Sequence, residues 1–111
     1  MAREALTLQS IVRGGLEPAY TAANADGHSV TNDGKRTFVH VNNGSGSEVT
    51  ITIDTPGTVD GLAISDREVA VPAGEERMIG PFPTDWYNQS DGTVHVDYSD
   101  TTSVTIGAFK V

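Results

Sequence analysis

The sequence predicts a small all-β protein, an antiparallel β-sandwich of Greek-key or jelly-roll type with roughly seven or eight short strands. Several segments alternate apolar and polar residues with a period of two, the pattern of strands with one buried face. Twelve glycines and five prolines divide the 111 residues into short pieces. No segment has the length and periodicity of a helix that could connect two parallel strands.

The clearest alternation surrounds Val49, where Val49, Ile51 and Ile53 face one way and the polar residues between them face the other. Residues 94–98 and 104–108 repeat this pattern, and residues 38–41 form a fourth strand whose buried face the sequence leaves open. These four segments are predicted strands of two packed layers.

Turn-forming residues separate the predicted strands. Pro72 and Gly74 occupy positions typical of a type I turn followed by a left-handed glycine, so we expect a hairpin between residues 68–71 and 76–79. The loops 42–47 and 100–102 are expected to join neighbouring strands in the same way. Residues 16–35 show no sustained period and are predicted to be a long excursion.

The domain organisation follows from length and from the start of the chain. Residues 13–111 are predicted to be a single β-sandwich domain, and residues 1–12 an N-terminal strand or arm. The chain has no cysteine, which excludes disulfides and thiolate metal ligands. The start lacks the continuous apolar run of a signal peptide, and no stretch approaches the roughly 20 apolar residues of a membrane span.

The charge balance disfavours nucleic acid as a partner. Seven Lys and Arg residues stand against fifteen Asp and Glu residues, for a formal net charge of −8. Binding to a phosphate backbone needs a dense basic surface, whereas Lys35 and Arg36 are the only adjacent basic pair. We expect neither nucleic acid nor membrane as a partner.

No constellation of residues predicts catalysis, a cofactor or a metal. His40 and His95 lie on predicted strands and are expected either to meet across a sheet or to stand apart, and no histidine pair has the helical spacing of a zinc site. The segment beginning at Asn24 resembles a calcium loop but has Ser29 and Lys35 where glycine and glutamate are required. The protein is therefore predicted to be non-enzymatic.

The chain concentrates Phe82, Trp86 and Tyr87 within one short segment. Three interpretations remain open for such a cluster. The aromatic side chains close the open end of a sandwich, anchor a protein interface, or form a stacking platform for a sugar together with Asp85, Asn88 and Gln89.

Several turns and strand ends carry a resemblance that spans nearly the whole chain. They include Val71-Pro72-Ala73-Gly74-Glu75, Gly80-Pro81-Phe82-Pro83 and Asn88-Gln89-Ser90-Asp91-Gly92. In these segments the sequence resembles small head-associated structural proteins of tailed bacteriophages, particularly phages of actinobacteria.

This resemblance implies a capsid decoration, or cement, protein that binds the outer face of the major capsid protein lattice, often as a homotrimer. It implies a location on the capsid surface of the virion, after assembly in the cytoplasm of the host bacterium. The alternatives are a tail or head-to-tail connector component and a carbohydrate-binding module. The candidate interface anchors are apolar residues of the N-terminal arm and of the aromatic cluster: Leu6, Leu8, Ile11, Phe82, Trp86 and Tyr87.

Overall fold

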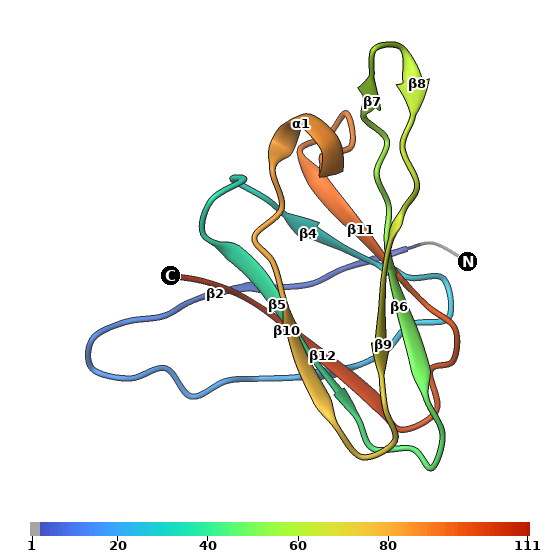
Figure 1. Cartoon of the computed structure of the whole chain (residues 1–111). Coiled ribbons are helices and arrows are strands. Elements are labelled where there is room, and N and C mark those ends of the chain that lie inside the picture. Colours follow the sequence, from blue (N-terminus) through green and yellow to red (C-terminus); the bar gives the residue numbers. More distant parts are fainter. Residues whose placement is uncertain (1–2) are drawn as a thin grey trace.

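The computed structural model describes residues 3–111, and the structure is mostly β, in agreement with the predicted all-β class (Figure 1). Strands make up 45% and helix 4% of the described residues. The single helix in this part of the chain is α1 (Thr84–Tyr87). Four of the strands contain only two residues, so the described chain has more strands than the sequence predicted.

Two larger sheets account for most of the strands. The first sheet has the order β1 (Glu4–Ala5), β4 (His28–Thr31), β11 (Thr93–Tyr98), β6 (Val49–Ile53) and β9 (Arg67–Val71). The second sheet has the order β10 (Glu76–Ile79), β5 (Thr37–Asn43), β12 (Val104–Lys110) and β2 (Leu8–Ser10), and β3 (Thr21–Ala22) also pairs with β12. The hairpin β7 (Thr58–Val59) and β8 (Leu62–Ala63) forms a separate two-stranded sheet.

One hydrophobic core lies between the first and second sheets. Val30, Ile51 and Val96 of the first sheet are fully buried, as are Val39 and Ile106 of the second. All belong to one cluster of buried residues. The period of two in the sequence produces this core, because alternate side chains of each strand point to the same side.

The expectation of purely antiparallel pairing is wrong at the N-terminus. β1 pairs with β4 and β2 pairs with β12, both in parallel. The N-terminal segment thus passes from the first sheet to the second along one flank. An alternating pattern specifies which side chains are buried, but it carries no information about strand direction.

The predicted hairpin across Pro72 and Gly74 is also wrong, although the turn itself is present. The amide of Glu75 donates to the carbonyl of Pro72 at 3.0 Å, and Gly74 has a φ of 74°. The turn leads from β9 in the first sheet to β10 in the second, where β10 pairs with β5. The connections from β5 to β6 and from β11 to β12 cross between the sheets as well. Turn residues reverse the chain without deciding which sheet receives the next strand.

Candidate interaction surface

The outer face of the first sheet is polar. Val30, Val96 and Ile51 point into the core, so their strand neighbours point outward. The outward side chains include the small side chain of Ala70 and the polar side chains of Ser29, Thr31, Thr50, Thr52, Glu68, Thr93, His95 and Asp97, none of which is buried. This composition is typical of a sheet face in contact with water.

The outer face of the second sheet is different, because aromatic side chains occupy it. Phe38 of β5 and Phe109 of β12 lie opposite each other in register, and their rings stack with centroids 5.7 Å apart. Met78 of β10 lies opposite His40, and 69% of it is exposed. Tyr20 packs edge-on against Phe109 and His40. We call these five residues, Tyr20, Phe38, His40, Met78 and Phe109, the aromatic face.

A chain of hydrogen bonds fixes the polar groups of the aromatic face. The Nε2 atom of His40 lies 2.6 Å from Oε1 of Glu76, and its Nδ1 atom lies 2.6 Å from the hydroxyl of Tyr20. A carboxylate only accepts, so Nε2 of His40 donates to Glu76, and in the neutral form of the ring Nδ1 accepts from the hydroxyl of Tyr20. Burial, assisted by the charge of Glu76, raises the pKa of Tyr20, which keeps its hydroxyl protonated as a donor.

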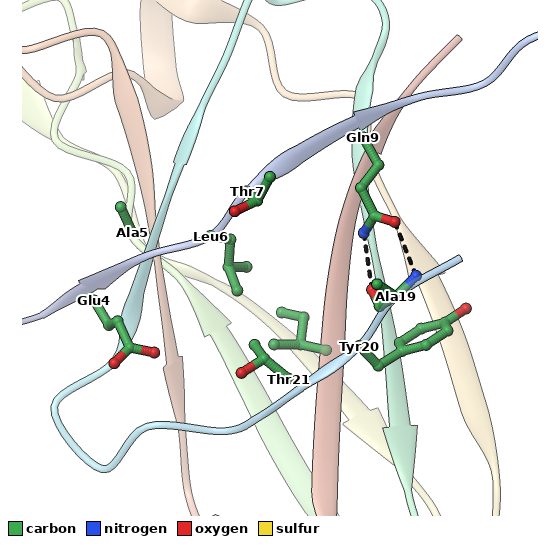
Figure 2. A pocket seen from close by; sticks show the side chains of 9 residues that line it. Glu4, Ala5, Leu6, Thr7, Gln9, Ala19, Tyr20 and Thr21 are labelled. Carbon is green, nitrogen blue, oxygen red and sulfur yellow. Dashed lines mark hydrogen bonds between the residues drawn. The ribbon is translucent and has the colours of Figure 1, made fainter. Parts of the chain in front are cut away.

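The loop 11–20 stands beside the aromatic face and is tied at both ends. The side-chain amide of Gln9 donates to the carbonyl of Ala19 at 2.8 Å and accepts from its amide at 2.9 Å, as Figure 2 shows. The amide of Ile11 donates to the carbonyl of Lys110 at 2.9 Å. At Gly107 a side chain would come within 3.0 Å of the Ala19 carbonyl, so glycine lets the returning chain cross β12 closely.

Two shallow hollows flank the exposed Met78 side chain. One, of about 300 Å³, lies between the loop and the aromatic face and is lined in part by Ile11, Val12, Leu16 and Pro18. The other, of about 460 Å³, is lined in part by Lys35, Arg36 and Val111. Both are lined by Phe38 and Met78. The second sheet therefore presents a continuous apolar surface bounded on one side by basic residues.

The three candidate anchors of the N-terminal segment lie in different environments. Leu6 is 9% exposed and belongs to the core, and Leu8 packs partly buried against it. Only Ile11, 45% exposed, remains available, and it lines the hollow beside the aromatic face. The expectation that Leu6 belongs to an exposed arm is therefore wrong, because β1 and β2 are integral parts of the sheets. Residues 1 and 2 of the expected arm lie outside the described part of the chain.

The three candidate anchors of the aromatic cluster also separate. Phe82 is 2% exposed and belongs to the core, which matches the interpretation that it closes the end of the two layers. Tyr87 packs against Phe82 with ring centroids 5.5 Å apart. Trp86, 44% exposed, is the accessible member. The expectation that Phe82 is exposed as an interface anchor is therefore wrong.

The polar residues of the possible sugar platform are occupied within the protein. The carbonyl oxygen of the Asn88 side chain accepts from the amide of Asn32 at 2.7 Å. The side-chain amide of Gln89 donates to a carboxylate oxygen of Asp54. Sugar recognition needs polar groups that are free to turn toward a ligand beside the stacking ring. Because Asn88 and Gln89 are bonded within the protein, they are not free to bind a sugar beside Trp86 and Asp85.

A further hollow of about 440 Å³ lies between the N-terminal segment and residues 19–21 (Figure 2). Among the described residues, Glu4 and Tyr20 are the only titratable ones that line it. Figure 2 shows them at opposite ends of the hollow. A general acid and base that act on one substrate must both reach the reacting group, so this pair does not form a catalytic site.

The histidines do not assemble a metal site. His40 lies in β5 of the second sheet and His95 in β11 of the first, so they do not meet across a sheet. Among residues 3–111 no group of three or more His, Cys, Asp or Glu side chains could hold a metal ion. Within the same residues, no helix has the length and apolar character needed to cross a membrane.

Comparisons with protein-family models, with curated proteins and with solved structures found no match to this chain. The candidate surface therefore rests on the residues themselves. Sequence reasoning did not single out Tyr20, Phe38, Met78 or Phe109. The available signal was an aromatic residue on the outer side of a strand: Phe109 points away from Ile106 and Ala108, and although it is only 5% exposed, it lies against Tyr20 and Phe38 on the outer face.

Proposed function

We propose that this chain is a non-enzymatic structural protein of a virion that decorates the outer face of a bacteriophage capsid. The sequence resemblance supplies the class of partner, the major capsid protein lattice. The contrast between the two outer faces carries the proposal: one is polar, while the other offers exposed Met78 and Ile11 beside stacked aromatic rings. Contiguous exposed apolar surface marks sites where proteins bind one another.

The aromatic face is the proposed lattice-binding surface. Rigid aromatic side chains lose little conformational entropy on binding, and the hydrogen bonds from Glu76 through His40 to Tyr20 hold this part of the surface in place. The loop 11–20 extends the surface with Ile11 and Val12, which are 45% and 55% exposed. In this proposal Ile11 is the retained anchor of the N-terminal segment.

Stabilisation of the shell follows from mass action. A protein that binds the assembled lattice and not its dispersed subunits shifts the equilibrium toward the assembled form. Several copies bound across subunit boundaries, as in the proposed homotrimer, multiply a modest individual contact. The protein would act at the capsid surface after assembly in the host cytoplasm, without a cofactor.

We further propose that the two layers form a β-sandwich of the Greek-key type. β4 lies in the first sheet and the next strand, β5, lies in the second. Later in the chain, β11 and β12 are divided between the two sheets in the same way. β4 pairs with β11 and β5 pairs with β12. A jelly roll would pair the first of these four strands with the last. The observed pairing supports the Greek-key alternative.

The proposal is tested by adding the purified protein to intact phage heads that lack it. We expect saturation at a fixed ratio to the capsid subunits, on the order of hundreds of copies per particle. Met78→Asp should weaken binding at least tenfold, because it places a charge at the centre of an apolar contact. Ala70→Asp is the matched control, since Ala70 is an exposed strand residue of the first sheet.

Other outcomes assign other roles. Saturation at about a dozen copies or fewer would support the connector alternative. No binding to heads, with quenching of Trp86 fluorescence by glycans, would support the carbohydrate-binding alternative. Equal loss of binding in both aspartate variants would remove the aromatic face as the site.

A further inference from the structure

The hairpin of β7 and β8 forms an apolar projection. It extends away from the two sheets at one end of the molecule (Figure 1). Val59 and Leu62 are paired in register and are 53% and 70% exposed. Asp60 and Gly61 connect them with φ angles of 53° and 76°, the conformation of a two-residue type I′ turn. We call Val59, Asp60 and Leu62 the hairpin tip.

The hollow bounded by Lys35 and Arg36 has the complementary character. Its lining includes the apolar side chains of Phe38, Met78 and Val111, and both Met78 and Val111 are 69% exposed. Lys35 and Arg36 are themselves exposed. Arg36 already pairs with Asp33 at 3.4 Å. We call this site the basic hollow.

We propose that the hairpin tip of one copy of this chain docks into the basic hollow of a second copy. Val59 and Leu62 then cover Phe38, Met78 and Val111, which removes two sets of exposed apolar side chains from water. Asp60 of the tip approaches Lys35 of the hollow, and the two opposite charges attract each other. Because the chain has only seven Lys and Arg residues, few other places on its surface could attract Asp60 in this way. Charge and apolar character match at the same contact.

The position of the two sites selects a second copy as the occupant. The hairpin extends from β6 and β9 of the first sheet, whereas Phe38 and Met78 lie on the outer face of the second sheet. A copy therefore does not fill its own hollow. Each copy offers one tip and one hollow, so the contact is head to tail and closes a ring where the rotation between copies allows it.

The contact uses Phe38 and Met78, which the proposed function assigns to lattice binding, so a copy whose hollow is filled by a tip does not bind the lattice through these two residues. Purified protein in the absence of capsids tests the contact separately from the proposed function. Leu62→Asp removes the tip and leaves the hollow intact, and Met78→Asp does the reverse. Both positions are highly exposed, so neither variant should compromise folding. Ala70→Asp again controls for the added charge.

We expect the mass of the unaltered protein, measured by light scattering, to rise with concentration up to about 1 mM. Each variant alone should remain a monomer. An equimolar mixture of the two should form dimers and stop there, because the only intact tip meets the only intact hollow. A symmetric contact between identical surfaces would not produce this rescue.

Nuclear magnetic resonance locates the contact. Isotope-labelled Leu62→Asp protein, titrated with unlabelled Met78→Asp protein, should show shifts at Phe38 and Val111. Reverse labelling should show shifts at Val59. A wild-type monomer at about 1 mM, association that both variants retain, or shifts confined to other surfaces would each overturn the proposal.

Discussion

The imidazole of His28 and the hydroxyl of Tyr98 form a hydrogen bond inside the protein, with Nδ1 and Oη 2.7 Å apart. His28 lies in β4 and is fully buried, and the two rings meet edge to face at 5.7 Å. Glu4 of β1 lies next to the other ring nitrogen, with Oε1 3.5 Å from Nε2. This pair holds a polar group in the core where the N-terminal segment joins the first sheet.

Removal of the Tyr98 hydroxyl is expected to destabilise the protein. Tyr98→Phe leaves Nδ1 of His28 buried without its partner, which should lower the free energy of unfolding by about 1–3 kcal/mol. The double variant His28→Phe with Tyr98→Phe removes both polar groups and should be more stable than the single variant. Urea denaturation measures both. Additive destabilisation by the two changes would contradict this account.

His28 also predicts how stability depends on pH. Burial lowers the pKa of His28 below its ordinary value of 6.5, against the opposing influence of Glu4. The unfolded chain therefore binds a proton in a pH range where the folded protein does not. The contribution of the neutral His28 to the free energy of unfolding is fully present above pH 6.5. It decreases as the pH falls from 6.5 toward the lowered pKa of the folded protein. The slope of unfolding free energy against pH should be smaller in the double variant, and parallel curves would refute this assignment.

Leu6 is expected to contribute to the core and Ile11 to the surface. Leu6→Ala should cost about 2–5 kcal/mol, as truncations of buried leucine do. Ile11→Ala, at a 45% exposed position, should change stability by less than about 1 kcal/mol. Thermal unfolding of the two variants compares them directly. Equal losses would show that the loop 11–20 packs as tightly as the core.

Gly57, directly before β7, sets the close approach of helix α1 to the segment that connects β6 with β7. A Cβ atom there would contact the carbonyl of Asp85 and the Cα atom of Trp86, both backbone atoms that cannot move aside alone. Gly57→Ala should cost about 1–3 kcal/mol and shift the fluorescence of Trp86. Gly46→Ala is the control, because no atom lies within 4 Å of its Cβ position. An unchanged emission spectrum in Gly57→Ala would contradict this packing.

The strands with sustained alternation were predictable from sequence, and their partners were not. β6, β11 and β12 match the predicted segments because buried β-branched residues recur at every second position. β4 was missed, since its buried residues are only His28 and Val30 within an otherwise polar stretch. The burial of His28 depends on Tyr98, 70 residues away, and no local pattern contains that information.

The candidate site was predictable only in part for the same reason. The exposure of Ile11 and Trp86 agrees with a role at the surface, whereas Leu6 and Phe82 complete the core. The aromatic face arises when β5, β10 and β12 become neighbours and the Tyr20 segment crosses over Gly107. Each of these contacts joins residues distant in sequence, so the aromatic face cannot be predicted until the strand order is known.

The parallel pairing of β2 with β12 has a mechanical consequence. β2 lies near the N-terminus and β12 near the C-terminus, and the backbone hydrogen bonds between them run across the strands. A force that pulls the two ends apart therefore slides the strands along each other and loads these bonds together, instead of opening them one after another.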